Sequence, residues 1–317
     1  MLLASCRHEK SKPETAVVKT EAVRVPAPDF NADSAFSFVK AQCDFGPRVP
    51  GTKAHEACAN YLVGKLKQYT PDVIVQAGKV TTYNGVNLDI KNIIARFNPS
   101  AKKRILLFAH WDTRPWADRD TVRQNEPILG ADDAGSGVGV LLELARILSQ
   151  TAPSVGIDIA FFDAEDYGTR AGEEGGDDSY ALGTQYWCRN LVPANYKAEY
   201  GILLDMVGAR NAQFGLEVIS RQYAPGVLTN VWNAANRIGY GAYFIYLEGG
   251  YITDDHLYVN EMAGIPSIDI IHTSATTGTG FPAHWHTHRD NMDVIDRSTL
   301  KAVGQTLLEV IFVSPGI

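Results

Sequence analysis

The sequence predicts an α/β protein with a mixed, mostly parallel central sheet and helices on both of its faces. Short apolar runs recur along the chain, which is typical of strands that are covered on both faces. Segments with helical periodicity separate several of these runs, as in βα units. Each run stops at a histidine or an acidic residue, so polar side chains would gather where parallel strands end. The runs are residues 104–109, 157–162, 201–204 and 265–271.

Two helices are expected ahead of the sheet. Asn31 or Asp33 caps the first, over residues 33–42, and Thr52 caps the second. Polarity then alternates on either side of an Asn84-Gly85 turn, which predicts antiparallel or edge strands. These strands are residues 73–83 and 86–97, and further helices are expected at 138–148, 180–190, 226–238 and 298–312.

Length and composition are those of one ordinary globular domain. The chain has 317 residues, of which 45% are hydrophobic and 21% charged, enough for one large core. With 29 Lys and Arg residues against 36 Asp and Glu residues, the net charge is -7. No basic cluster offers a footprint for nucleic acid, which is therefore not expected as a partner. A monomer is expected, and no segment approaches the roughly 20 apolar residues of a membrane-spanning helix.

The four cysteines indicate neither a thiolate zinc site nor a disulfide scaffold, because no C-x-x-C pair occurs. Cys43, Cys58 and Cys188 are expected to be buried apolar side chains, with a Cys43–Cys58 pair as the alternative. Cys6 differs, since Leu3-Ala-Ser-Cys6 resembles the lipobox of bacterial lipoprotein signal peptides. The stretch before it is shorter than the roughly 7 to 15 apolar residues of such signals, so an accidental match is the alternative.

A domain boundary is expected near residue 28. The segment from Arg7 to Pro28 is polar and punctuated by proline, as in a tether that does not pack. We therefore expect residues 1–28 to be a lipoprotein signal remnant and tether, and residues 29–317 to be a single catalytic domain. Lipidation of Cys6 would place the protein in the periplasm or at the outer membrane, anchored by that group alone.

Polar residues that follow the predicted strands indicate a metal centre. Burying several carboxylates together without a cation is costly. Imidazole and carboxylate ligands without cysteine suit Zn²⁺, which at a catalytic site takes about three protein ligands and keeps one position open. Magnesium fits this set less well. The candidates are His110, Asp112, Asp133, Glu165, Asp166, Asp205, Asp254, His272 and His286.

Adjacent Glu165 and Asp166 suggest a division of roles. Successive side chains diverge in an extended segment or tight turn, so one carboxylate can hold a metal while the other faces the reacting group. The alternative is that both follow their strand into solvent. A similar choice concerns the glycine-rich loop 168–179, whose acidic residues we interpret as solvated, because their spacing lacks the calcium-binding EF-hand pattern.

The order and spacing of five motifs resemble a known group of enzymes. The motifs are His110-Trp-Asp112, Gly130-Ala-Asp-Asp133 with Ser136-Gly137, Glu165-Asp166, Leu204-Asp205-Met206 and His286-Thr287. Beyond residue 35 the chain thereby resembles the zinc aminopeptidase-like peptidases of the M28 group and their α/β hydrolase topology. Three more stretches resemble the animal-type glutaminyl cyclases within that group: Leu203 to Asn211, Asp254-Asp255-His256, and Phe281-Pro-x-x-Trp285-His286-Thr287 followed by Asp290-Asn291.

The resemblance implies one zinc ion per chain, bound by Asp133, Asp166 and His286. Asp133 is chosen over Asp132 because the family's ligand is the fourth residue counted from the glycine, commonly followed by a cis peptide. The family usually has Glu where this chain has Asp166, one methylene shorter.

The resemblance also implies roles for the neighbouring side chains. Glu165 would be a proton shuttle, and Asp205 and Asp254 would complete an acidic network around the substrate. Trp285 and Phe281 would wall a pocket for a glutaminyl side chain, with core packing as the alternative. His272 and His288 are expected to be structural or rim residues.

The implied reaction converts the N-terminal glutamine of a peptide or protein into pyroglutamate and releases ammonia. A dinuclear zinc aminopeptidase is the alternative, with His110 and Asp205 binding a second zinc ion and Asp112 in support. Glu165 would then activate a bridging water molecule. A third interpretation is a lipid-anchored peptide-binding protein without catalysis.

Overall fold

The computed structural model describes Met1 and residues 26–314. Cys6 and nearly all of the expected tether therefore lie outside the described residues. Within the described part of the chain, no helix combines the length and apolar character needed to cross a membrane.

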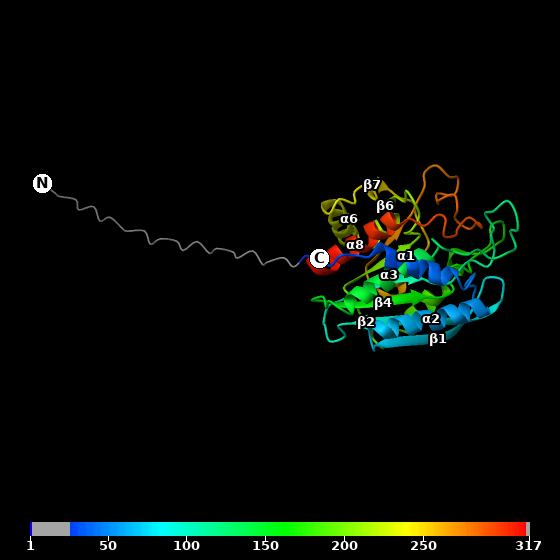
Figure 1. Cartoon of the computed structure of the whole chain (residues 1–317), viewed down its shortest axis with the longest axis horizontal. Helices are drawn as coiled ribbons and strands as arrows, with labels where there is room; N and C mark the ends of the chain where they lie inside the picture. The colour runs from blue at the N-terminus through cyan, green and yellow to red at the C-terminus, as the bar shows by residue number, and fades with distance from the viewer. Residues whose placement is uncertain (2–25, 315–317) are drawn as a thin grey trace.

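A six-stranded sheet forms the centre of the molecule, in the order β1-β2-β4-β3-β5-β8 (Figure 1). Strand β3 is parallel to β4 and β5, and β5 is parallel to β8. The remaining pairs, β1 with β2 and β2 with β4, are antiparallel. The mixed, mostly parallel sheet is confirmed, with strands β1 (Val73–Thr81), β2 (Asn87–Phe97), β3 (Arg104–His110), β4 (Gly156–Phe162), β5 (Tyr200–Asp205) and β8 (Ser267–Ile271).

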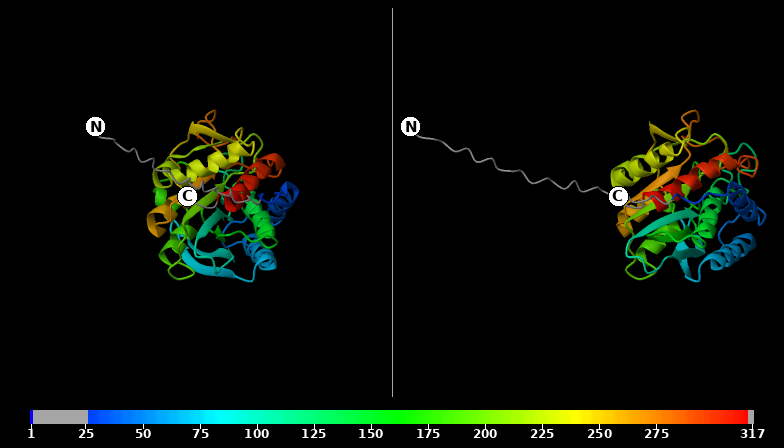
Figure 2. Two further views of the ribbon diagram at one scale, coloured as in Figure 1. Left: turned by 90° about the vertical axis from the view of Figure 1, so that its left-hand side faces the viewer. Right: turned by 60° about the vertical axis from the view of Figure 1, so that its left-hand side comes forward.

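Helices cover both faces of the sheet, as predicted. Alternate residues of β3 separate the two sides: Ile105 and Leu107 belong to one hydrophobic core, Leu106 and Phe108 to another. The larger core lies under α1 (Ala32–Cys43), α2 (Lys53–Tyr69), α3 (Gly135–Leu148), α6 (Pro225–Arg237) and α8 (Arg297–Val313). The smaller core lies under α4 (Leu182–Arg189) and α7 (Asp255–Ala263), and Figure 2 shows the sheet between the two helical layers.

Side-chain caps fix where the first two helices begin. The Asn31 side chain accepts a hydrogen bond from the backbone N–H of Ser34 at 3.0 Å, so Asn31 rather than Asp33 is the cap. Thr52 accepts a hydrogen bond from the backbone N–H of His55 at 3.2 Å. Both helices therefore begin where the sequence predicts.

Four elements were not expected from the sequence. They are β6 (Phe214–Leu216), α5 (Val218–Tyr223), β7 (Phe244–Glu248) and α7. Strands β6 and β7 form a separate parallel pair, too short to show a clear alternation. In α7, polar and apolar residues from Asp255 to Asn260 are all buried, so no apolar stripe marks the helix. A short 3₁₀ turn also occurs at Asp177–Ser179.

The cysteines of the described region are free and buried. Burial raises the pKa of Cys43 to about 11 and that of Cys58 to about 12, so both remain thiols at neutral pH. The prediction of buried apolar side chains is confirmed, and the alternative of a Cys43–Cys58 disulfide is wrong.

Gly137, near the start of α3, sets the distance between that helix and the sheet. A Cβ atom at this position would lie 2.3 Å from the carbonyl oxygen of Leu204 in β5. Only glycine therefore allows the helix start to lie against this strand. The close approach brings the loop before α3 next to the carboxyl end of β5.

Candidate metal centre and active site

The predicted polar side chains meet at one edge of the sheet. His110 and Asp205 are the last residues of β3 and β5. Glu165 and Asp166 lie in the turn that follows β4, and Asp133 lies in the loop before α3. Because β3, β4, β5 and β8 are parallel, their carboxyl ends share this edge, which is where α/β proteins place their sites.

Asp133, Asp166 and His286 form a first cluster with the geometry of a metal site. One ligand atom from each lies within 4.8 Å of the others. His286 Nε2 is 3.2 Å from Asp166 Oδ1 and 3.7 Å from Asp133 Oδ2. All three residues are buried. His286 has a positive φ of 55°, a conformation that is costly for a non-glycine residue and commonly found at functional sites.

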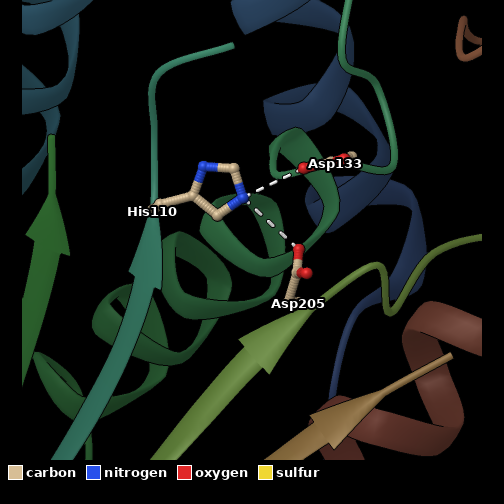
Figure 3. Close-up of side chains that lie close together, drawn as sticks. All are labelled: His110, Asp133 and Asp205. Carbon is tan, nitrogen blue, oxygen red and sulfur yellow. Dashed lines mark ion pairs between the residues drawn. The ribbon is translucent and has the colours of Figure 1, made fainter. Parts of the chain in front are cut away.

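His110, Asp133 and Asp205 form a second cluster, which Figure 3 shows in close-up. His110 Nε2 is 3.0 Å from Asp133 Oδ1 and 3.4 Å from Asp205 Oδ1. Asp133 therefore belongs to both clusters and presents one carboxylate oxygen to each histidine. This arrangement can hold one cation between Asp133 and His286, and a second one between Asp133 and His110.

The chemistry of the first cluster fits a bound cation. Asp166 Oδ2 is buried and has no hydrogen-bond partner among the described residues. An orphaned carboxylate oxygen is costly to bury, which a metal ion at this place would relieve. Two carboxylates and one imidazole, without a thiolate, are ligands that suit zinc.

The two adjacent aspartates, Asp132 and Asp133, point to different partners. Asp132 Oδ2 lies 2.9 Å from His284 Nε2, and its other oxygen accepts the backbone N–H of Gly208 at 2.8 Å. Asp290 fixes the backbone at both aspartates, because its carboxylate accepts their backbone N–H groups at 2.8 and 3.1 Å. A cis peptide follows Asp133, as the resemblance implied.

Asp112 supports the Glu165-Asp166 turn and lies in neither cluster. Its two carboxylate oxygens accept the backbone N–H groups of Glu165 and Asp166, at 3.0 and 3.2 Å. Asp112 Oδ1 also lies 3.4 Å from His110 Nδ1. One buried carboxylate thus fixes the direction in which the paired acidic side chains leave the backbone.

Arg114 and Asp118 connect two residues of the first cluster. Asp118 Oδ1 lies 3.4 Å from His286 Nδ1, on the ring edge opposite the cluster. Arg114 donates to both oxygens of Asp118, at 2.9 and 2.7 Å, and also to Asp166 Oδ1 at 3.3 Å. Burial opposes ionisation of Asp118, but Arg114 and His286 lower its pKa below the usual value. A single buried guanidinium therefore orients both an imidazole and a carboxylate of the cluster.

The acidic residues around Glu165 hold protons more tightly than usual. Burial raises the pKa of Glu165 well above its ordinary value. The charge of His110 lowers this pKa, whereas the charges of Asp254 and Asp166 raise it further. Burial and the charge of Asp205 likewise raise the pKa of Asp254. The pKa of Asp205 rises to about 6 through burial and the charge of Asp133. Carboxyl groups shifted in this direction can exchange protons near neutral pH.

A cavity of about 200 Å³ opens onto these acidic groups. Its lining also includes apolar residues, namely Met206, Ile252, Ile271, Phe281 and Trp285. The Trp285 ring stacks on the His286 ring, with centroids 3.7 Å apart, and lies 4.4 Å from the Phe281 ring. This cavity, the catalytic pocket, therefore combines acidic and aromatic lining residues.

Other histidines and acidic residues flagged by the sequence lie outside the two clusters. His272 lies beside His284, with ring centroids 6.4 Å apart. Asp163, which directly follows β4, forms a buried pair with His55 at 2.8 Å. Glu173 and Glu174 in the loop 168–179 are exposed, and Glu173 accepts a hydrogen bond from Tyr83.

No pattern in the sequence marks Arg114, Asp118 or Tyr180 as part of the site. Arg114 and Asp118 lie in the long polar loop that follows β3, where the sequence predicts neither a helix nor a strand. Tyr180 lines the catalytic pocket from the end of the acidic loop. None of the three follows a strand directly, and none belongs to a motif that carries the family resemblance.

Comparison with known proteins assigns the chain to a family. The model of peptidase family M28 matches residues 92–311. A glutaminyl cyclase from Bacteroides thetaiotaomicron, solved with N-acetylhistamine, is 53% identical with a TM-score of 0.89, covering 90% of this chain and 99% of that one. A zinc-dependent exopeptidase from Parabacteroides distasonis is 54% identical with the same TM-score and the same two coverages.

A curated relative extends the similarity to animals. The glutaminyl-peptide cyclotransferase of Drosophila melanogaster is 26% identical over 286 residues, which are 80% of this chain and 73% of the relative. The matched family region contains both clusters of the candidate metal centre. The chain therefore belongs to peptidase family M28, and it shares its fold and about half of its residues with solved bacterial glutaminyl cyclases.

Proposed function

We propose that this protein is a zinc-dependent glutaminyl cyclase, which converts the N-terminal glutamine of peptides and proteins into pyroglutamate and releases ammonia. The observation that carries the proposal is the catalytic pocket, which is lined both by Glu165, a carboxyl group with a raised pKa, and by the aromatic residues Phe281 and Trp285. The cyclases among the relatives, at 53% and 52% identity, support the same activity.

Asp133, Asp166 and His286 would hold the zinc ion in this proposal. Their donor set suits that metal, and one open position would remain for the substrate. When bound, zinc acts as a Lewis acid that polarises the γ-carboxamide of the substrate. Trp285, stacked on His286, lies where it can pack against the methylene groups of the glutaminyl side chain.

Glu165 would move the proton in the reaction. Its carboxylate accepts a proton from the α-amine of the substrate, whose nitrogen forms a bond to the side-chain carbonyl carbon. The bond from that carbon to the amide nitrogen breaks, and Glu165 returns the proton to the departing ammonia. Asp205 and Asp254 line the same pocket and keep the pKa of their acidic neighbours high. The nucleophile belongs to the substrate, so the reaction consumes no water.

The second cluster favours one competing function, a dinuclear zinc aminopeptidase. His110, Asp133 and Asp205 are arranged as three ligands of a second ion would be. The similarity to a solved zinc-dependent exopeptidase also supports the aminopeptidase alternative. In the cyclase, His110 instead contacts Asp133 and Asp205 directly, and its imidazole bridges the two carboxylates.

Mass spectrometry of a glutaminyl peptide after incubation with the protein separates these functions. A cyclase produces a peptide of unchanged length that is lighter by one ammonia molecule. Release of free glutamine would establish the aminopeptidase, and tight binding without turnover would establish a binding protein. Metal analysis provides a second test, with about one zinc ion per chain for the cyclase and about two for the aminopeptidase.

We also propose that the protein is attached by a lipid on Cys6 in the periplasm or at the outer membrane. Support comes from Leu3-Ala-Ser-Cys6 and from the polar segment that follows. Labelled fatty acid should be incorporated into the full chain but not into its Cys6→Ser variant. Equal labelling of the two proteins, or none of either, would remove the proposal.

A further inference from the structure

Arg48 has a completely buried side chain, in the segment between α1 and α2. Among the described residues, its guanidinium group forms no ion pair with a carboxylate and instead donates hydrogen bonds to three backbone carbonyl groups. Burying a charge without an opposite partner is costly, and these three hydrogen bonds are what offsets the cost. The function proposed above gives this arginine no role.

Two of the three carbonyl groups lie at the start of the loop that presents Asp133. Arg48 Nη1 donates to Leu129, and Nη2 donates to Gly130 at 2.7 Å. The Gly130 carbonyl also accepts the backbone N–H of Gly135 at 3.3 Å, which closes the loop around Asp133. Gly130 has a φ of 59°, and a Cβ there would clash with the Asp133 carbonyl oxygen, so this position requires glycine. Arg48 thus fixes the base of the loop whose aspartate belongs to both metal clusters.

The third carbonyl group belongs to Trp111, in the segment that follows β3. Arg48 Nε donates to this carbonyl at 3.4 Å, and the Trp111 N–H donates to the carbonyl of Phe162 at the end of β4, at 3.0 Å. Trp111 lies between His110, a member of the second cluster, and Asp112, which supports the turn of the adjacent acidic residues. The same guanidinium group therefore also fixes the segment on the other side of the metal centre.

We propose that Arg48 is a positioning residue for the metal centre. It sets the separation between the segment after β3 and the loop before α3, and thereby the separation between His110 and Asp133. Asp133 thus gains through its backbone the kind of support that a buried ion pair gives the other two ligands of the first cluster. The inference rests on the proposed zinc-dependent function, but it concerns metal binding rather than the reaction.

The geometry calls for a guanidinium group. Each of the three nitrogen atoms donates to a different carbonyl group, and the plane that holds them is rigid. A lysine ammonium is a single nitrogen atom on a flexible stem, so it cannot reproduce three separate contacts. Arg48→Lys therefore keeps the positive charge and removes the bridge between the two segments.

The experiment measures zinc affinity by competition with a chelator of known affinity. Arg48→Lys should bind zinc about tenfold more weakly, since disturbing the groups that orient metal ligands has effects of this size. Arg104→Lys is the matched control, because Arg104 is also buried and pairs with Asp158, but lies at the end of β3 remote from His110. It should bind zinc as the unsubstituted protein does. Equal affinity in all three proteins, or an equal loss in both variants, would overturn the inference.

A second variant, Arg48→Met, fills the same space without a buried charge. It should weaken zinc binding at least as much as Arg48→Lys, because it also lacks the three hydrogen bonds. Unchanged affinity in Arg48→Met would show that the lysine ammonium, and not the lost bridge, disturbs the site.

Replacing zinc with Co²⁺ adds a spectroscopic readout of ligand geometry. The visible absorption bands of the bound cobalt should shift in both Arg48 variants and stay unchanged in Arg104→Lys. Identical spectra in all of these proteins would contradict a positioning role for Arg48. Neither measurement requires turnover, so a protein that binds zinc but does not cyclise glutaminyl peptides would refute the proposed function and leave this test valid. Unchanged zinc affinity in the Arg48 variants would remove only the role of Arg48.

Discussion

Asp118 is placed to orient His286, because its carboxylate faces the ring nitrogen opposite the metal cluster. A histidine ligand whose other nitrogen is hydrogen-bonded to a carboxylate is fixed in ring orientation and tautomer. Arg114 holds that carboxylate with two hydrogen bonds and also reaches Asp166. Two of the three proposed ligands thus depend on one buried ion pair.

Asp118→Asn should weaken zinc binding about 10- to 100-fold, the usual cost of disturbing such a partner. Competition with a chelator of known affinity measures this without relying on turnover. Asp89→Asn removes the same charge at an exposed position on β2 and is the control. Equal zinc affinity in both variants would show that Asp118 does not position His286.

Glu165→Gln should lower kcat about 100- to 10,000-fold, the range expected for loss of a general acid and base. Zinc should remain bound, since Glu165 belongs to neither metal cluster. Steady-state kinetics and metal analysis of the same preparation provide the two measurements. Loss of zinc from this variant would mean that Glu165 is itself a ligand and that the roles of the adjacent acids are reversed.

At the scale of the elements, the approach of α3 to β5 brings Asp133 close to Asp205. Gly137→Ala should destabilise the protein by about 1–3 kcal/mol, because the added Cβ meets the Leu204 carbonyl at 2.3 Å. Gly64→Ala is the matched control in α2, where a Cβ has open space, and it should stabilise by about 0.5–1 kcal/mol. Denaturant unfolding measures both changes. Similar effects of the two substitutions would show that the contact between helix and strand is not close.

Glu217 joins α5, α7 and the segment that leads to Asp254. Its carboxylate accepts the backbone N–H groups of Ile219 and Ser220 at 2.9 and 2.6 Å, and that of Ile252 at 3.3 Å. His256 Nε2 lies 3.2 Å from the same group. Burial alone would raise the pKa of Glu217, but the hydrogen bonds from His256 and the backbone lower it below its ordinary 4.5.

Because the folded pKa is lowered, Glu217 stabilises the protein above about pH 4.5, and this contribution is lost as the pH falls through the folded value. Thermal unfolding midpoints measured from pH 7 down to pH 3 should therefore decline more steeply for the unsubstituted protein than for Glu217→Gln. Glu199→Gln, at an exposed position, should follow the unsubstituted curve. Parallel curves for all three proteins would show that Glu217 contributes no acid-sensitive stability.

At the scale of the whole molecule, we expect the buried carboxylate clusters to make the stability of the fold depend on a bound metal ion. Removing zinc with a chelator should lower the midpoint of thermal unfolding, and restoring zinc should reverse the change. The free energy of unfolding should rise by up to about 4 kcal/mol at free zinc 1,000-fold above its Kd. The raised pKa values of Glu165 and Asp254 mean that the metal-free protein loses stability as the pH rises above the ordinary values of these groups, 4.5 and 3.8. A midpoint that does not respond to zinc would argue against a bound ion.

The sequence predicted correctly those features that depend only on residues close together along the chain. Apolar runs with polar ends located β3, β4, β5 and β8, and the caps at Asn31 and Thr52 located two helices. The predictions missed α7, because its buried positions include polar residues whose partners lie elsewhere in the chain. They left a Cys43–Cys58 pair open, since no pattern along the chain reports whether two thiols are bonded.

The sequence alone determined the fold class, the edge of the sheet that carries the site and, through its resemblance to a known family, the residues proposed to bind zinc. Only the tertiary structure decided which side chains surround them. It showed that Arg114 links Asp118 to Asp166, that Asp132 faces His284, and that the catalytic pocket combines acidic and aromatic side chains. The physical reason is that strand and helix patterns arise from short-range periodicity. Ion pairs and cavities depend instead on contacts between residues far apart in the chain, which no local pattern records.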